Sequence, residues 1–275
     1  MHTITVANRK GGVGKSSVAT HLAAALAIRG ARVLVIDMDS QASTTAMLLD
    51  GLDDDAPTTR QLLLGQARLP GIIQPSTRAG VDLAPACGEL TRAQFAIAAK
   101  TGRETILRRA MRDVDYDVAV IDTAPELQLA TLNALVAATH VLMPFTPDPK
   151  ALEGLRTTSE AVAEILAAEL ATPAMLGCVQ VAYDRRLAVT EQSREQVAAA
   201  YGELLFETRV RANSSFIVCP AWHRDIFAME RQDGARTRGS QDFLALADEV
   251  IERIGLALAA QPAATTRTES RIAAA

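Results

Sequence analysis

The chain has 275 residues, of which 49% are hydrophobic and 22% charged, a composition that can bury the core of one large α/β domain. The formal net charge of -4 excludes a uniformly basic nucleic-acid-binding protein, although basic residues can still gather on one face. No apolar run reaches membrane-spanning length and no signal peptide precedes the first predicted strand, so we expect a cytoplasmic location.

The N-terminal segment has the pattern of a strand, a glycine-rich loop and a helix. Residues 2–8 alternate and are rich in β-branched side chains, which predicts a buried strand. Residues 16–29 have helical apolar spacing and are followed by Gly30, a residue typical of helix ends. Between them, residues 9–17 read Arg-Lys-Gly-Gly-Val-Gly-Lys-Ser-Ser. This order of elements is the context that a phosphate-binding loop requires.

The loop residues have the chemistry to hold the phosphates of a nucleotide. Glycines lack Cβ, so the backbone N–H groups can point at one centre, and the following helix adds its positive dipole end. Lys15 would contact the β- and γ-phosphates of ATP, and the Ser16 hydroxyl would bind Mg²⁺. We therefore predict that the nucleotide is held by Gly11, Gly12, Val13, Gly14, Lys15, Ser16 and Ser17.

The loop departs from the common pattern and carries a second lysine. Arg9 stands where the pattern G-x-x-x-x-G-K-[ST] has its first glycine. The usual phosphate-binding loop has one lysine, at the position of Lys15, so we expect the additional Lys10 to reach into the active site of a partner. A simple glycine-rich turn with Lys15 in solvent is the alternative, which the flanking strand and helix disfavour. A dinucleotide motif would need a glycine at Ser17.

Two further apolar segments end in carboxylates. Residues 32–39 predict a strand that ends in Asp37 and Asp39, which lie two positions apart and so share one face. Residues 116–122 predict another strand, which ends in Asp122. Solvated charges are the alternative, but carboxylates at such strand ends are the usual magnesium partners in phosphoryl-transfer sites. We predict Ser16, Asp37 and Asp122 as metal residues and Lys10, Lys15 and Asp39 as catalytic residues, with Asp39 orienting the attacking water.

The remaining pattern predicts a mainly parallel, twisted sheet with helices on both faces. Ligands bind such sheets beyond the carboxyl ends of the strands, where the loop and the acidic residues lie. An acidic, turn-rich segment predicts a surface loop, and a last core helix precedes an aperiodic tail. The strands are expected at 2–8, 32–38, 81–84, 117–122, 139–145 and 175–182, the surface loop at 49–57, the last helix at 240–260, the P-loop domain over 1–260 and a disordered tail over 261–275.

These motifs resemble those of the deviant-loop ATPases of the ParA and MinD group. The signature Lys-Gly-Gly-x-Gly-Lys-[Ser/Thr] corresponds to residues 10–16, Asp-x-Asp-x-Gln to residues 37–41, and Asp-Thr-x-Pro to residues 122–125. Segments 132–138 and 151–155 resemble those of ParA-type chromosome and plasmid partition ATPases. The resemblance covers about residues 2–256.

The resemblance implies a homodimer that sandwiches ATP and Mg²⁺, with Lys10 of each subunit contacting the nucleotide of the other. Hydrolysis would be slow until a ParB-like protein stimulates it, and the ATP-bound dimer would bind DNA non-specifically and associate with the nucleoid. By register, Arg211 and Asn213 would contact the adenine. Ser215 stands where many DNA-binding members carry an arginine, so DNA affinity should be weakened. The candidate DNA-binding residues are Arg185, Arg186, Arg209, Arg224, Arg236 and Arg238.

Other members of the same group suggest alternatives. The switch could position a non-DNA cargo or a division regulator, or the scaffold could serve a metabolic ATP-dependent enzyme. An iron–sulfur reductase would need a cysteine shortly after Asp122, and residues 122–132 contain none. The tail lacks the basic amphipathic helix of MinD-like members, so we expect no membrane binding.

Overall fold

The computed structural model describes residues 1–233 and 238–258, with residues 230–233 described by their backbone alone. Its centre is an eight-stranded sheet with the order β3-β4-β2-β5-β1-β6-β7-β8. Neighbouring strands run parallel, except for the antiparallel pair of β3 and β4. The strands are β1 (His2–Val6), β2 (Val33–Met38), β3 (Gln74–Pro75), β4 (Val81–Ala84), β5 (Val118–Thr123), β6 (His140–Phe145), β7 (Ala174–Tyr183) and β8 (Leu205–Arg211).

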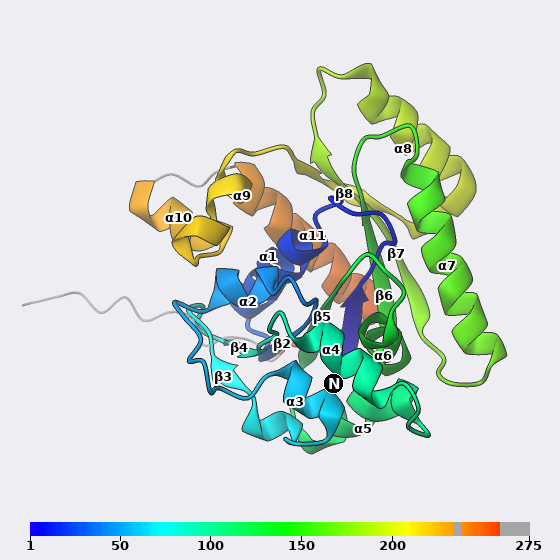
Figure 1. Cartoon of the computed structure of the whole chain (residues 1–275). Helices are drawn as coiled ribbons and strands as arrows, with labels where there is room; N and C mark the ends of the chain where they lie inside the picture. The colour runs from blue at the N-terminus through cyan, green and yellow to red at the C-terminus, as the bar shows by residue number, and fades with distance from the viewer. Residues whose placement is uncertain (234–237, 259–275) are drawn as a thin grey trace, which may run out of the picture.

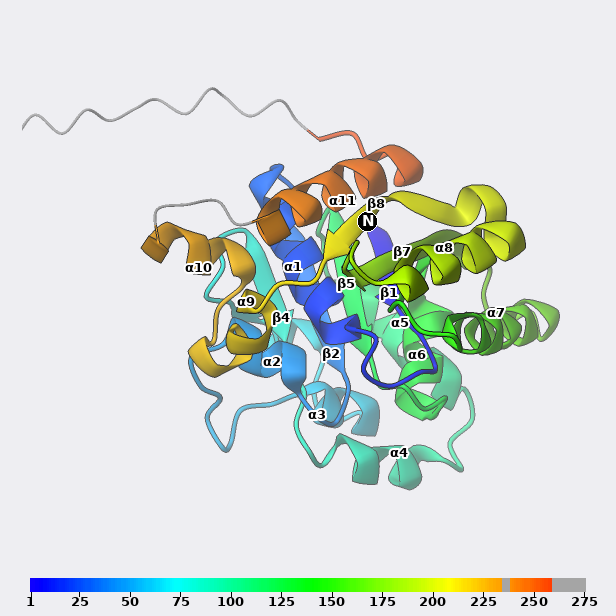
Figure 2. The same cartoon turned by 90° about the horizontal axis from the view of Figure 1, so that it is seen from above.

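Helices cover both faces of this sheet, which confirms the predicted α/β fold (Figures 1 and 2). One face packs against α1 and α11, and the other against α3 to α8. The helices are α1 (Lys15–Ile28), α2 (Ser43–Leu48), α3 (Thr59–Leu64), α4 (Leu90–Ile97), α5 (Ile106–Ala110), α6 (Leu129–Ala137), α7 (Ala151–Ala167), α8 (Ala188–Tyr201), α9 (Ser215–Val218), α10 (Ile226–Asp233) and α11 (Arg238–Ile254).

The central strands are apolar because both of their faces are covered. Every residue of β2 is buried. Val33 and Val35 belong to the core beneath α1 and α11, whereas Leu34 and Ile36 belong to the core on the opposite face. Parallel strands that are buried on both sides have this continuous apolar pattern. An acidic residue in such a strand is therefore an exception that needs a function.

The first helix ends at the predicted glycine, whereas the last helix ends earlier than predicted. The first helix ends where Gly30 takes φ 101°, and Ala31 N donates to Leu26 O at 3.1 Å, which closes the last turn. The last helix, α11, ends at Ile254, six residues before the predicted end. Residues 261–275, predicted as a disordered tail, lie outside the described residues. In the part of the chain that the structure describes, no helix is long and apolar enough to cross a membrane.

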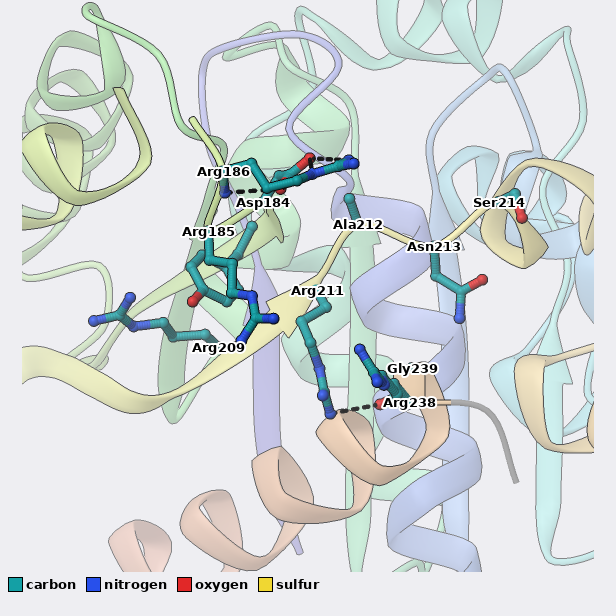
Figure 3. A pocket seen from close by; sticks show the side chains of 11 residues that line it. Asp184, Arg185, Arg186, Arg209, Arg211, Ala212, Asn213, Ser214, Arg238 and Gly239 are labelled. Carbon is teal, nitrogen blue, oxygen red and sulfur yellow. Dashed lines mark hydrogen bonds and ion pairs between the residues drawn. The ribbon is translucent and has the colours of Figure 1, made fainter. Parts of the chain in front are cut away.

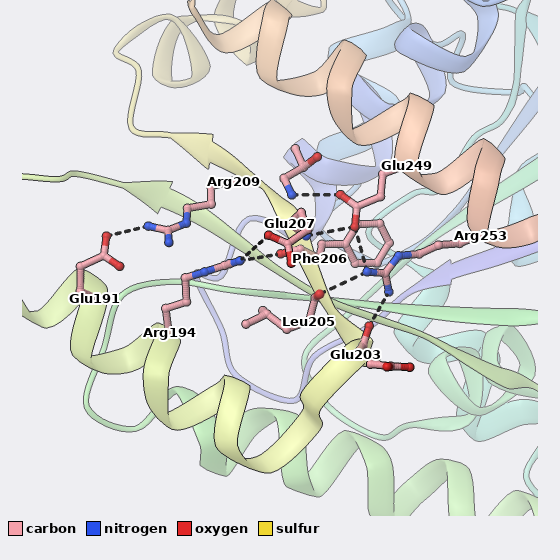
Figure 4. Close-up of polar contacts among 10 residues, drawn as sticks. Glu191, Arg194, Glu203, Leu205, Phe206, Glu207, Arg209, Glu249 and Arg253 are labelled. Carbon is pink, nitrogen blue, oxygen red and sulfur yellow. Dashed lines mark hydrogen bonds and ion pairs between the residues drawn. The ribbon is translucent and has the colours of Figure 1, made fainter.

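The sheet has an edge strand, β8, that the sequence pattern did not indicate. It carries Glu207 and Arg209 between apolar residues, so its charged content resembles a loop. Two side chains of α11 hold it in place (Figure 4). Glu249 accepts from the backbone N–H of Glu207 and Thr208 at 3.0 and 2.9 Å, and Arg253 donates to the Leu205 carbonyl at 3.2 Å. The helix thus satisfies backbone groups that an edge strand leaves unpaired.

Candidate functional site

The glycine-rich loop connects β1 to α1 at the carboxyl edge of the sheet. Gly12 and Gly14 take φ values of 72° and 77°, in the left-handed region that glycine adopts without strain. The first helical residue is Lys15, whose side chain is buried and donates to the Lys10 carbonyl at 3.3 Å. Burial lowers the pKa of Lys15, while the charges of Asp122 and Asp39 oppose this shift. The loop therefore has the strand, curl and helix start that the sequence predicted.

The two predicted magnesium carboxylates lie side by side. Asp37 on β2 is the register partner of Asp122 on β5, and both are fully buried. Burial raises the pKa of both carboxyls, and the charge of Asp122 raises that of Asp37 further. Asp122 Oδ1 is buried and has no hydrogen-bond partner among the described residues. An unpaired buried carboxylate oxygen close to a lysine and a serine requires a partner, which a hydrated cation can supply.

These residues fit Mg²⁺ bound together with a nucleotide. No group of three or more His, Cys, Asp or Glu side chains in the described residues could hold a metal on its own. Mg²⁺ needs few protein ligands, because it keeps several waters and takes oxygens from the phosphates of the substrate. When bound, the ion would neutralise charge that develops on the transferred phosphoryl group. Ser16 lies in the first turn of α1, and its hydroxyl is close enough to Asp122 to lower the pKa of that carboxyl, while Asp37 is the register partner of Asp122 on the neighbouring strand.

Asp39 is the residue directly after the end of β2, and it is buried. Its backbone N–H donates to Asp37 Oδ1 at 3.0 Å, and its own Oδ1 accepts from Gln41 N at 2.9 Å. The following Ala42 takes φ 51°, a left-handed conformation that turns the chain into α2. This turn fixes Asp39 beside the loop, where a carboxylate can orient a water.

The second lysine of the loop lies away from the first. Lys10 Nζ forms an ion pair with Asp148 at 2.7 Å, with side-chain exposures of 31% and 38%. The backbone of Lys10 is held by Asn8, whose Oδ1 accepts from Lys10 N at 2.8 Å. In α7, Gly154 packs so closely on this loop that a Cβ there would lie 3.0 Å from Lys10 Cβ. Asp148 and the close approach at Gly154 could not be identified from the sequence, because neither has a local pattern.

A largely apolar cavity of about 530 Å³ opens beside the loop. Gly12, Gly14 and Ser17 form one wall, and the carboxyl ends of β7 and β8 form another. Asn213 lines this cavity, as expected for an adenine contact, whereas Arg211 does not. A concave, mainly apolar site next to a phosphate loop suits a nucleoside. The other lining residues are Val18, Thr146, Val181, Ala182, Val210, Ala212, Ser214, Phe216, Ile217 and Phe243.

A second cavity of about 770 Å³ gathers five arginines (Figure 3). Three of them are paired within the chain: Arg186 with Asp184, Arg209 with Glu191, and Arg211 with Asp242. The other two, Arg185 and Arg238, are exposed and show no ion pair within the described residues. We call the set of Arg185, Arg186, Arg209, Arg211 and Arg238 the arginine cavity.

The remaining DNA-binding candidates are not part of the arginine cavity as the structure describes it. Arg224 precedes α10 and is not a lining residue of the arginine cavity. Arg236 lies outside the described residues. Ser215, at the position where an arginine was expected for strong DNA binding, begins the four-residue helix α9, and its N–H donates to Asn213 Oδ1 at 2.9 Å.

The chain is similar to known proteins over most of its length. Residues 1–172 match a family model described as an AAA domain. The chromosome-partitioning ATPase Soj of Thermus thermophilus is 35% identical over 251 residues, which cover 91% of this chain and 96% of that protein. The chromosome partitioning protein ParA of Myxococcus xanthus is 31% identical, covering 91% of this chain and 88% of that protein.

Solved structures share the fold. Cobyrinic acid a,c-diamide synthase of Mycobacterium smegmatis, with a bound ATP analog and magnesium, is 28% identical with a TM-score of 0.72, covering 86% of this chain and 98% of that chain. McdA of Cyanothece, as an ATP complex, has a TM-score of 0.81 at 20% identity, covering 95% of this chain and 99% of that chain. The second likeness concerns the fold alone.

Proposed function

The chain belongs to the ParA/Soj family of P-loop ATPases, which use ATP and Mg²⁺, and on this premise we propose that it is a dimeric switch for DNA partition. In this proposal the ATP-bound dimer binds DNA non-specifically, and slow hydrolysis, accelerated by a ParB-like protein, releases it. The protein would then be cytoplasmic and would associate with the nucleoid while ATP is bound.

The observation that carries the proposal is the separation of the two lysines. Lys15 is buried in the loop beside Asp39 and Asp122, so it can serve the nucleotide of its own subunit. Lys10 lies at the surface on Asp148, outside the curl of the loop. A lysine in this position supports a role in a second subunit, where it would stabilise negative charge in the transition state. Hydrolysis would then require both subunits to be aligned.

Each proposed catalytic residue has its own role at the phosphates. The loop N–H groups and Lys15 would bind and orient the β- and γ-phosphates. The buried carboxylates of Asp37 and Asp122 would hold Mg²⁺, which would supply positive charge next to the transferred phosphoryl group. Asp39 accepts a hydrogen bond from the attacking water and aligns it with the γ-phosphorus. Lys10 of the partner subunit completes the charge balance.

The arginine cavity is the proposed DNA surface. A chain with net charge -4 needs such local concentration of positive charge, and each phosphate that is neutralised adds to the salt dependence of binding. Within the arginine cavity, only Arg185 and Arg238 show no ion pair to a described residue, so we propose that few phosphates are contacted by each subunit.

The decisive experiment uses the Asp39→Ala variant, which should bind ATP and dimerise without hydrolysing it. We expect a dimer with Mg²⁺ and ATP but not with ADP, and DNA binding only in the dimeric state, with affinity that falls as salt rises. The exposed Asp50→Ala variant is the matched control and should retain hydrolysis. A monomeric Asp39→Ala protein at saturating ATP would refute the switch, and a dimer that ignores DNA would refute the DNA cargo.

A metabolic enzyme on the same scaffold remains a second candidate, favoured by the 28% identity to cobyrinic acid a,c-diamide synthase. Such an enzyme would couple ATP turnover to a small acid and ammonia donor. It would show ATP turnover that depends on a small molecule and is indifferent to DNA or a protein activator. ATPase assays with each addition in turn separate the two functions.

A further inference from the structure

Two consecutive threonines of α2 each bind one of the buried carboxylates. Thr44 Oγ1 donates to Asp122 Oδ2 at 2.8 Å. Thr45 donates twice to Asp37 Oδ2, from its hydroxyl and from its backbone N–H, both at 2.8 Å. Both threonines are buried. A short helix thus reaches two neighbouring strands, β2 and β5, at the place where their carboxylates meet.

Two hydroxyls, those of Ser16 and Thr44, lower the pKa of Asp122, and the Thr44 hydroxyl is the one that donates to Oδ2 at hydrogen-bond distance. Oδ2 is occupied by the Thr44 hydroxyl, whereas Oδ1 is buried and unpartnered within the described residues. The hydroxyl of Thr44 also lies 3.5 Å from the carbonyl of Ser16, so it stands between the acidic strand end and the start of α1. Without this donor, the carboxylate of Asp122 could rotate and present either oxygen to the loop.

The same helix is linked to the turn that carries Asp39. Ala42 N donates to Asp39 O at 2.9 Å, and Ala46 N donates to Ala42 O at 2.9 Å. The turn and the first residues of α2 therefore form one hydrogen-bonded unit. A shift of Asp39 would move Thr44 and would change how Asp122 is held.

We propose that Thr44 is a positioning residue of the magnesium site, which fixes Asp122 so that Oδ1 is left for a water of the hydrated Mg²⁺. Thr45 holds Asp37 on the neighbouring strand through Oδ2, and the Oδ1 of Asp37 accepts from Asp39 N, so both oxygens of Asp37 have donors within the chain. This inference rests on the proposed binding of Mg²⁺ and ATP. Helix α2 orients both carboxylates, so a movement of the turn that carries Asp39 also changes the metal site.

The test compares nucleotide binding with and without the metal. Thr44→Val keeps the shape of the side chain and removes the donor. A fluorescent ATP analogue is titrated in EDTA and in a series of Mg²⁺ concentrations. We expect the half-saturating Mg²⁺ concentration to rise roughly tenfold or more, because a hydrogen bond to a charged group is lost. Affinity in EDTA should change less than about twofold, and Thr44→Ser should restore the Mg²⁺ response.

Thr190→Val is the matched control, since Thr190 is also buried and its hydroxyl donates to the Asp184 carbonyl far from the metal carboxylates. An unchanged Mg²⁺ response of Thr44→Val would refute the assignment, as would an equal loss of affinity with and without Mg²⁺. If Thr44→Val unfolds, Thr44→Ala and Thr44→Ser are compared instead, with the same two outcomes. A wild-type chain that binds no nucleotide would refute the proposed function as well, whereas wild-type binding with an unresponsive variant refutes only this inference.

Discussion

The ion pair between Lys10 and Asp148 should oppose dimerisation. If Lys10 crosses to a second subunit, it must first leave Asp148, to which it is joined at 2.7 Å. Asp148 lies between Pro147 and Pro149, whose rings restrict the backbone, and its Oδ1 also accepts from Lys150 N at 2.7 Å. The carboxylate is therefore held in place, and the lysine is the group that moves.

The size of the effect follows from the exposure of the pair. The two side chains are 31% and 38% exposed, so solvent screens the attraction and each pair contributes about 0.2–1 kcal/mol. A symmetric dimer releases two such pairs. Removing both should favour the dimer by about 0.4–2 kcal/mol, which corresponds to a roughly two- to thirty-fold lower dissociation constant.

The assay measures the dimer dissociation constant of Asp39→Ala and of Asp39→Ala with Asp148→Asn, by sedimentation at saturating ATP and Mg²⁺. The matched control is Asp248→Asn, which breaks the surface pair with Arg29 and should leave the constant unchanged. Adding Lys10→Ala should abolish the difference that Asp148→Asn makes. An equal or weaker dimer in the Asp148→Asn protein would refute the reasoning, because Lys10 would then not be in competition.

Three other predictions concern the stability of the fold and the proposed DNA surface. Burial lowers the pKa of His21 to about 4, whereas the pKa of this histidine in the unfolded chain is near 6.5. As pH falls from about 6.5 to 4, the unfolded chain therefore binds a proton at His21 that the folded chain does not bind. Stability should decline through that window by up to about 3 kcal/mol in urea unfolding, and His21→Gln should flatten the decline. Asp225→Asn should lower the free energy of unfolding by about 3–5 kcal/mol in the same assay, because it leaves the buried Arg78 without its ion-pair partner. A decrease below about 1 kcal/mol would contradict this prediction. Arg185→Gln should lower the salt slope of DNA binding by about one for each subunit, or about two for the dimer. Arg186→Gln removes a residue already paired with Asp184 and should change the slope less. Equal slopes for the two variants would contradict the assignment of Arg185.

The arrangement of the loop and the acidic strand ends could be predicted because each part is local in the sequence. The loop, its helix start and the carboxylates of Asp37 and Asp122 each stand at the end of a short pattern. Parallel strands then bring these ends to one edge of the sheet, and the register confirms that Asp37 and Asp122 are neighbours. Local motifs and topology were together sufficient for this part of the molecule.

Contacts between distant segments could not be predicted in the same way. Strand β8 depends on Glu249 and Arg253 of α11, which lie about forty residues further along the chain. Its own charged residues gave no apolar run. Likewise, the net charge of the arginine cavity depends on Asp242 and Glu191, whose pairing with arginines has no sequence signature.

The segment between β8 and α9 has a consequence for how ligands influence one another. Ala212, Asn213 and Ser214 line both the apolar cavity beside the loop and the arginine cavity. Asn213 also packs on Gly239 of α11, where a Cβ would lie 2.9 Å from its Nδ2, so the segment has little freedom to move on one side alone. If a ligand in one cavity displaces this common wall, the affinity of the other cavity for its ligand changes, and thermodynamic linkage requires the change to be equal in both directions. If bound nucleotide raises the affinity for a polyanion by a given factor, bound polyanion raises the affinity for the nucleotide by the same factor.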